Sequence, residues 1–481
     1  MKRMAGMLLV GALALAGCGS DDDKTAEGDW SASTGSFAIS GLDTGFGNAG
    51  VASTPLSAAE GDRFLSVAVG KDGKVYGVGF VAPGGDQAMA VGRIKADGTL
   101  DTTFSDDGIA TVNVADGGKA GEQSRGVAVQ STGKVVVAGP FEHDPKAAGD
   151  AARDTDIAVT RFDPSGKLDA SFGAGGTTKV DLSTGLVLPP AAGATTTANT
   201  VVGDTMWGLT VLPDDKLIAV GATPAKGEGR TDLDFAIMRF TADGALDPSF
   251  GTAGVLTVDV DGGNESPRQA VVQPDGKVVV SGYTRTTATP AVVHPALVRL
   301  MPDGTLDQSF GKGGVAGETL LPAVAEAYEV GMQGDRYVIT GYGRATADEK
   351  VDLIAARFTA DGQWDKTFGT DGLVRIDVAH EDDRGRDLVA LPDGRILIAG
   401  SGKPDAANID AMLVLLDENG VLDPGFGTGG TLQVDLGGPA DSFFGVALTP
   451  DGKHAIVTGY KGTEPATGDD AVVARVAVAA T

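Results

Sequence analysis

The sequence predicts an all-β protein made of one repeated unit, and two observations carry this prediction. The segment Leu246 to Gly251 reads Leu-Asp-Pro-Ser-Phe-Gly, and relatives of its Leu-Asp-x-x-Phe centre recur along the chain. Seven phenylalanines mark the copies, at spacings of 58, 68, 78, 60, 58 and 58 residues: Phe46, Phe104, Phe172, Phe250, Phe310, Phe368 and Phe426. Glycine, 73 of 481 residues, separates short β-branched runs. A fixed period of this kind indicates one extended domain whose repeats share a core.

Each repeat supplies four strands, which we call a, b, c and d in chain order. In the fourth repeat they are expected at 268–272, 277–282, 296–300 and 315–319, with Pro-Asp-Gly turns after strands a and c. Strands b and c are apolar on both faces, so each small sheet must be covered on both sides. Radial stacking of four-stranded sheets provides that cover, and the sequence therefore predicts a β-propeller.

The first and last copies predict how the ring closes. A signature at Leu42 to Phe46 precedes any complete a–b–c set, and no signature follows the seventh set. We expect the N-terminal strand to complete the C-terminal blade, which gives seven blades without an open edge. The propeller then spans 36–481, with the closing strand in 36–55 and blades at about 60–115, 119–183, 203–261, 264–320, 325–379, 383–437 and 440–481.

The N-terminus has the features of an export signal. Lys2 and Arg3 precede an apolar run from Met4 to Leu15, which is too short to span a bilayer, and Leu-Ala-Gly-Cys follows. This resembles the bacterial lipoprotein box, in which the cysteine is lipidated. We expect a signal peptide at 1–17, a lipid anchor on Cys18, a flexible tether to residue 35 and a place in the bacterial cell envelope, at the outer membrane because Gly19 and Ser20 follow.

The repeat itself resembles a known family. The segment from Gly126 to Gly173 contains GVAVQ, TGKVVVAG and DIAVTRFDPSGKLDASFG. It is similar to the delta-60 repeats of bacterial β-propellers and to the NHL-type propeller pattern, in which the first strand is innermost. The resemblance covers about 36–481 and implies architecture without a catalytic residue. Two copies depart from the signature, with Ser105 for Gly and Trp364 for Leu.

Two recurrent charged positions have structural interpretations. Strand c carries an arginine in six of the seven repeats, and the sixth repeat has Leu415 instead. The arginines are Arg93, Arg161, Arg239, Arg299, Arg357 and Arg475. We expect each to pair with the signature aspartate. An acid precedes strand a in every repeat: Glu60, Glu122, Asp204, Glu265, Glu326, Asp383 and Asp441. These acids either form a ring at the channel mouth that binds a cation such as calcium, or serve in local capping or in pairing with the residue three positions on. That residue is an arginine in four repeats: Arg63, Arg125, Arg268 and Arg386.

The remaining features favour a binding protein. The b–c and d–a connections vary in length and emerge on one face of a propeller, which is where we expect contacts, including His143, His294 and His380. The net charge of −27 makes nucleic acid a poor partner. We expect a monomeric, non-enzymatic binding or scaffold module for a protein or glycan, without a cofactor. The alternatives are a hydrolase or lyase with a composite site at the channel mouth, and a purely structural surface protein.

Overall fold

The computed structural model describes residues 37–38, 41–57, 61–82, 85–115, 121–144, 154–188, 200–378, 380–405, 407–462, 468–477 and 479–480. The expected signal peptide, Cys18, the tether to residue 35 and Glu60 lie outside these ranges. The described residues form strands, turns and loops without an α-helix. None of them forms a helix with the length and apolar character needed to cross a bilayer.

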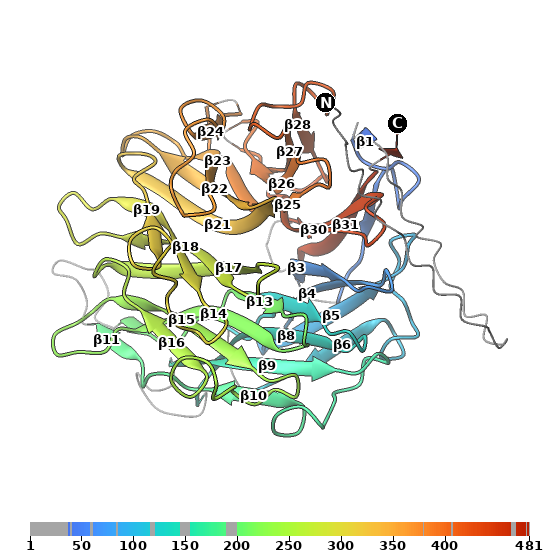
Figure 1. Cartoon of the computed structure of the whole chain (residues 1–481). Helices are drawn as coiled ribbons and strands as arrows, with labels where there is room; N and C mark the ends of the chain where they lie inside the picture. The colour runs from blue at the N-terminus through green and yellow to red at the C-terminus, as the bar shows by residue number, and fades with distance from the viewer. Residues whose placement is uncertain are drawn as a thin grey trace, which may run out of the picture.

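Most strands form antiparallel sheets in which sequence neighbours pair (Figure 1). Three four-stranded sheets come first in the chain: β3 (Arg63–Val69), β4 (Val75–Val81), β5 (Ala88–Ile94) and β6 (Ile109–Val112); β7 (Gly126–Val129), β8 (Val135–Glu142), β9 (Thr155–Phe162) and β10 (Thr177–Val180); β13 (Gly208–Val211), β14 (Leu217–Pro224), β15 (Leu233–Phe240) and β16 (Val255–Val258).

The next two sets are joined into one sheet by a single parallel pair, Val293 with Val324. They are β17 (Asn264–Val272), β18 (Val278–Arg285), β19 (Val293–Leu300) and β20 (Val315–Gly317), then β21 (Val324–Gln333), β22 (Arg336–Arg344), β23 (Asp352–Phe358) and β24 (Leu373–Ile376).

The last two sheets bring the chain back to its beginning. They are β25 (Arg384–Ala390), β26 (Ile396–Gly402), β27 (Asp410–Leu416) and β28 (Thr431–Val434), then β29 (Ser442–Leu448), β30 (His454–Lys461), β31 (Asp470–Ala477) and the N-terminal β2 (Val51–Ser53). Two short pairs lie outside these sets: β1 (Phe37–Ala38) with β32 (Ala479–Ala480), and β11 (Leu186–Leu188) with β12 (Thr200–Val202).

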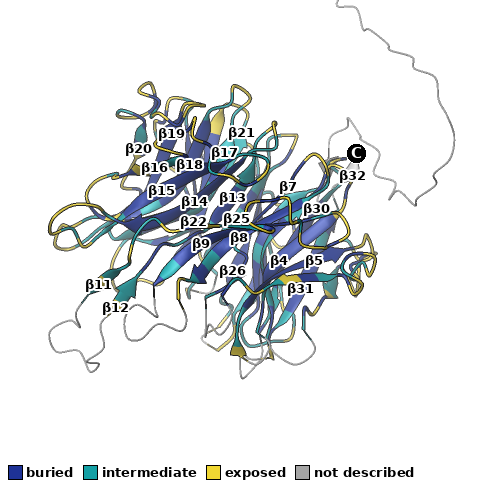
Figure 2. Ribbon diagram, turned by 90° about the horizontal axis from the view of Figure 1, so that it is seen from below, coloured by how far each residue is buried: buried dark blue, intermediate teal, exposed yellow. Residues whose placement is uncertain are grey.

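The sheets are arranged around a common axis with the a strands innermost, as the positions of β3, β13, β17, β21 and β25 in Figure 1 show. The core lies between neighbouring sheets, and the loops carry most of the exposed residues (Figure 2). Strand β5 is buried at every position, whereas β3 is buried at only two of seven, because one face of an a strand looks towards the axis. The expectation that strands b and c are covered on both faces is confirmed.

The signature phenylalanines plug the gaps between neighbouring sheets, as their size predicts. Phe104, at the end of the first repeat, is fully buried among residues of both the first and the second sheet, such as Val91 and Val137. The glycine that follows each phenylalanine has a positive φ, for example 51° at Gly251, where a β-carbon would lie 2.5 Å from the carbonyl oxygen of Val255. Ser105 adopts the same left-handed conformation, with a φ of 52°.

Candidate functional site

Each repeat turns one side chain towards the axis near the start of its a strand, and in five repeats a β-bulge lies at that residue. The pairing register skips one residue in β3, β17, β21, β25 and β29. A bulge leaves one residue unpaired and can redirect its side chain. Arg125 and Trp207 hold the corresponding positions, one residue before β7 and β13. The seven axial residues are Leu65, Arg125, Trp207, Arg268, Tyr328, Arg386 and Phe444.

These seven residues line an axial pocket of about 310 Å³, together with Ser66, Gln269, Glu329 and Asp387. Six of the seven alternate between arginine and an aromatic residue around the axis. The Arg125 guanidinium lies 4.2 Å from the centre of the Trp207 ring, and that of Arg268 lies 3.9 Å from Trp207 and 4.3 Å from Tyr328. The guanidinium of Arg386 lies 5.3 Å from the Tyr328 ring and 4.9 Å from the Phe444 ring. Cation–π contacts therefore connect the ring from Arg125 to Phe444.

The three axial arginines lack carboxylate partners. None of the ion pairs within the described ranges involves Arg125, Arg268 or Arg386. Arg125 donates to the Gln123 amide oxygen at 2.8 Å, and Arg268 donates to the Tyr283 hydroxyl at 2.8 Å. The buried Nε atoms of Arg268 and Arg386 have no hydrogen-bond partner. Burial, and then the neighbouring charge of Arg268, lowers the pKa of Arg125 to about 10, and burial lowers the pKa of Arg386.

Two acids lie in the next position along the a strands. The Asp387 carboxylate accepts backbone N–H bonds from Leu388 at 2.7 Å and from Val446 at 2.8 Å, and Glu329 accepts one from Val330 at 3.1 Å. Burial raises the pKa of both groups, and the Asp387 charge raises that of Glu329 further. The pocket thus combines guanidinium donors and aromatic faces with two carboxyl groups that can exchange hydrogen bonds with a ligand.

The recurrent acids before the a strands hold loop backbone. Glu122 accepts N–H bonds from Val114 at 2.8 Å and Ala115 at 2.6 Å, and Asp441 accepts them from Leu436 at 2.8 Å and Gly462 at 3.0 Å. Asp204, Glu265 and Asp383 make equivalent contacts with backbone N–H groups at the end of the preceding repeat, those of Leu182, Val260 and Val378. These contacts are of the kind that local capping requires. The expected partners three residues later, Arg125, Arg268 and Arg386, point to the axis instead.

Two repeats depart from this pattern. In the first, Asp62 accepts N–H bonds from Leu56 at 2.8 Å and Ala471 at 2.9 Å, so it is the counterpart of the other acids two residues after Glu60. In the fifth, Ala325 takes the capping position and is fully buried. The Glu326 carboxyl lies near the Tyr342 hydroxyl, where its charge adds to burial in raising the pKa of that hydroxyl, and its Oε2 is buried without a hydrogen-bond partner.

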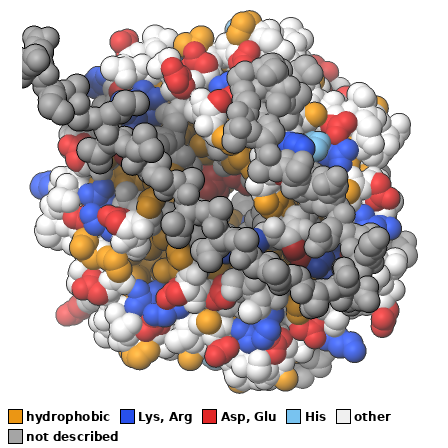
Figure 3. Space-filling view, turned by 45° about the vertical axis from the view of Figure 1, so that its right-hand side comes forward, with side chains coloured by type: hydrophobic (Ala, Val, Ile, Leu, Met, Phe, Trp, Pro, Cys, Tyr) orange, Lys and Arg blue, Asp and Glu red, His pale blue; other side chains and the backbone are white. Residues whose placement is uncertain are grey.

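The three candidate histidines belong to different repeats, with His143 after β8, His294 in β19 and His380 before β25, and none of them lines the axial pocket. Each Nδ1 or Nε2 contacts an aspartate: His143 with Asp156 at 2.7 Å, His294 with Asp261 at 3.1 Å, and His380 with Asp377 at 2.6 Å. The structure therefore does not bring them together. Acidic and basic side chains are interspersed on the face seen in Figure 3.

Two groups of side chains near His143, which share Asp156, hold possible metal-ligand atoms close together. Within the described ranges, such groups are formed by His143, Asp154 and Asp156, and by Asp156, Asp181 and Asp204, with atoms within 4.8 Å of one another. Buried Oδ1 atoms of Asp154 and Asp156 have no hydrogen-bond partner. Asp204 is thus the one recurrent acid found in such a group, and three carboxylates of this kind suit a hard cation such as calcium.

The strand-c arginines form a second, outer set with different surroundings. The predicted ion pairs are present: the Nε atom of each donates to the signature aspartate at 2.8–2.9 Å, as in Arg93 with Asp101 and Arg475 with Asp43. Each also donates to a carbonyl oxygen in the turn of the next sheet and lies over the signature phenylalanine. Where Leu415 replaces the arginine, Arg395 reaches Asp423 at 3.1 Å.

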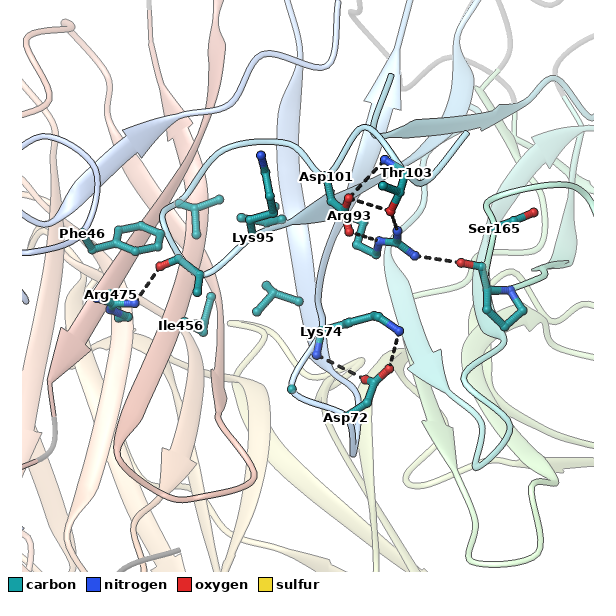
Figure 4. A pocket seen from close by; sticks show the side chains of 16 residues that line it. Phe46, Asp72, Lys74, Arg93, Lys95, Asp101, Thr103, Ser165, Ile456 and Arg475 are labelled. Carbon is teal, nitrogen blue, oxygen red and sulfur yellow. Dashed lines mark hydrogen bonds and ion pairs between the residues drawn. The ribbon is translucent and has the colours of Figure 1, made fainter. Parts of the chain in front are cut away.

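A second cavity, of about 900 Å³, is lined by two of these outer clusters. Figure 4 shows Arg93 bound to Asp101, Thr103 and a backbone carbonyl, and Arg475 bound to the carbonyl oxygen of Ala96. This cavity lies beside the a–b turn at Asp72 and the c–d turn at Ser165. Its arginines are already neutralised, so the axial pocket is the stronger candidate site.

Trp207, Tyr328, Phe444, Glu329 and Asp387 were not identified from the sequence. Aligning the repeats on their recurrent acids and reading the third residue after each would have found most of the axial ring. Tyr328 would still have been missed, because it follows Glu326 by two residues.

Five segments match a family model described as a domain of unknown function (DUF5122) beta-propeller: residues 70–104, 130–172, 212–250, 273–310 and 391–426. Each match runs from the end of an a strand to the signature phenylalanine. Together with the sheets, these matches show that the chain is a β-propeller repeat protein. A search of the curated proteins found no match.

Solved structures with a similar fold include a protein of unknown function from Dyadobacter fermentans, at 10% identity, 89% coverage of this chain, 100% of the other and a TM-score of 0.44. Another is the gluconolactonase XC5397 from Xanthomonas campestris, at 12% identity, with coverage of 73% and 92% and a TM-score of 0.31. No function is transferred from them.

Proposed function

We propose that this protein is a non-enzymatic binding module of the bacterial cell envelope, with its ligand site in the axial pocket. The observation that carries the proposal is the ring of alternating arginine and aromatic side chains. Pockets that recognise ligands combine apolar and aromatic walls with a few polar groups. The ring lies near the start of the a strands, and the hydroxyl that Arg268 contacts belongs to Tyr283, near the end of strand β18. The variable d–a and b–c connections join the strands at this end.

The proposal includes a closed ring of seven blades with delta-60-type repeats. It is supported by the pairing of Val51 with Ala474 in an antiparallel ladder between β2 and β31. Arg475, on the last sheet, also donates to the carbonyl oxygen of Ala96 on the first sheet, at 2.7 Å. The same contact links five other pairs of neighbouring sheets, which supports a ring in which the last sheet packs on the first.

The proposed location rests on the N-terminal sequence, in which Cys18 follows Leu-Ala-Gly. A lipid on Cys18 would hold the monomeric propeller at the outer membrane, with the loop face open to a protein, a glycan or a smaller ligand. The hydrolase or lyase alternative is less well supported, because His143, His294 and His380 each contact a different aspartate and lie outside the axial pocket.

A thermal-shift screen of the full-length chain in detergent, against peptides, sugars and small metabolites, tests this proposal. A ligand at one hundred times its dissociation constant adds about 2.7 kcal/mol to the folded state. The Trp207→Leu variant removes an axial ring, and Trp364→Leu is its control, because leucine occupies that signature position in the other repeats. We expect a stabilising ligand to lose its effect in Trp207→Leu alone. Equal ligand-induced thermal shifts in the wild type and in both variants, or no thermal shift with any compound of the panel, would contradict binding at the axial pocket.

A further inference from the structure

We infer that the axial pocket binds a small hydroxy-carboxylate of the sugar-acid class, with its carboxylate held by Arg125, Arg268 and Arg386. This inference rests on the proposed function and specifies the ligand of the same site. Three features of the pocket support it: the unpaired cations, the aromatic walls and the two carboxyl groups.

The arginines of the axial pocket have no ion-pair partner among the described residues, and an anionic ligand would provide one. Removing a charged group from water costs several kcal/mol unless a partner compensates it. The Arg268 residue is only 8% exposed and faces Trp207, Tyr283 and Tyr328. An aromatic face attracts a cation but supplies no oxygen acceptor, so guanidinium donors such as the buried Nε atoms of Arg268 and Arg386 stay free. A carboxylate accepts paired N–H donors from a guanidinium fork and would compensate the charge.

The aromatic walls and the size of the pocket indicate a compact organic molecule. A volume of about 310 Å³ is at the lower end of ligand pockets and admits a small molecule rather than a folded segment. The aromatic side chains of Trp207, Tyr328 and Phe444 line the pocket together with Leu65. These surfaces would contact the carbon skeleton of the ligand, which favours an organic anion over sulfate or phosphate.

The carboxyl groups of Glu329 and Asp387 indicate hydroxyl groups on the ligand. They line the same pocket as the arginines, and carboxyl oxygens accept hydrogen bonds from hydroxyl groups. A sulfate ion has no hydroxyl hydrogen to donate to them. A molecule with one carboxylate and several hydroxyls can instead place its anionic end on the arginines, and its hydroxyl groups can donate hydrogen bonds to the two carboxyl groups. Sugar acids have this pattern, either free or as the terminal unit of an acidic glycan.

Calorimetric titration of the full-length chain with galacturonate, galactose, sodium sulfate and trigalacturonate tests the inference. Galactose is the neutral counterpart of galacturonate. We expect galacturonate to bind at least tenfold more tightly than galactose or sulfate. Tighter binding of trigalacturonate than of galacturonate identifies the glycan end as the source, and equal or weaker binding identifies the free sugar acid.

The Arg268→Met and Arg386→Met variants locate the binding. Each should weaken galacturonate binding at least tenfold, and Arg285→Met, which removes an exposed arginine outside the axial pocket, should leave it unchanged. The two axial variants are independent, and a thermal melt verifies that each is folded. Galactose binding as tightly as galacturonate, with loss in both axial variants, would overturn the anion inference but retain the binding module.

Sulfate binding as tightly as galacturonate would overturn the sugar-acid assignment. Equal galacturonate binding by the wild type and both axial variants would overturn the assignment of the arginines. A failure of the proposed function itself is distinguishable, because then no ligand of the wider screen would depend on Trp207.

Discussion

The outer and axial arginines have the same side chain in opposite surroundings. On strand c, Arg239 is bonded to Asp247 at 2.9 Å and to the Ser249 hydroxyl at 2.8 Å, and it lies over Phe250. At the axis, Arg268 has two tyrosine hydroxyls within hydrogen-bonding distance and an unpartnered Nε. The outer guanidinium is neutralised within the fold, and the axial one is not.

The contrast separates residues that hold the fold from residues available to a ligand. The outer cluster recurs with the period of the repeat and bridges neighbouring sheets, so its chemistry is satisfied by the architecture. The axial position varies from repeat to repeat and faces a cavity. Recurrence therefore marks structure in this protein, and variation at one fixed position marks the candidate site.

Deleting residues 36–55 should lower the stability of the protein more than any other change to the outer arginine clusters. The deletion removes β2 together with Asp43 and Phe46, the partners of Arg475. Loss of the buried Phe46 side chain alone costs about 3–5 kcal/mol, and the edge of β31 becomes unpaired. We expect the melting temperature to fall by more than ~10 °C. An unchanged melting temperature in a calorimetric scan would refute the closure.

Substituting one outer arginine should be the next largest change. Arg239→Met leaves Asp247 buried without its main partner, and removing one member of a buried ion pair costs about 3–5 kcal/mol. Lys216, 3.1 Å from the same carboxylate, should reduce the loss to the lower end of that range. Denaturant unfolding measures it, and a loss below about 1 kcal/mol would show that the outer clusters do not hold the blades together.

The capping acids should make stability fall as pH rises. Burial raises the pKa of Glu265 to about 8 and that of Asp383 to about 7, despite the N–H bonds they accept. The folded state therefore binds more protons than the unfolded state between about pH 4 and pH 8. Their contribution is fully present below the unfolded pKa and is lost as pH rises through the folded pKa.

Unfolding free energies measured between pH 5 and pH 8 test this slope. We expect the decline to be smaller in Glu265→Gln than in the wild type, by on the order of 1–3 kcal/mol over the range. Parallel pH curves for the two proteins would show that Glu265 is ionised at every pH in that range.

The sequence predicted the parts of the molecule that repeat. The apolar runs, the Pro-Asp-Gly turns and the signature phenylalanines each carry a local physical reason, and the strands and inter-sheet plugs follow from them. The pairing of Arg239 with Asp247 was predictable because both positions recur eight residues apart. The axial ring was not, because its members share a place near the start of the a strand, marked in five repeats by a β-bulge, rather than a residue type. A bulge has no strong sequence pattern when the bulged residue varies from Leu65 to Arg268 to Phe444.

The unfolding free energy of Arg268→Met, measured beside that of Arg239→Met, tests the central claim most directly. If the axial arginines serve a ligand, replacing a buried, unpaired guanidinium by a methionine of similar length leaves stability unchanged or raises it by about 1 kcal/mol. Arg239→Met loses about 3 kcal/mol or more. A comparable loss in both variants would contradict the account, because it would mean that the axial arginines hold the fold as the outer ones do.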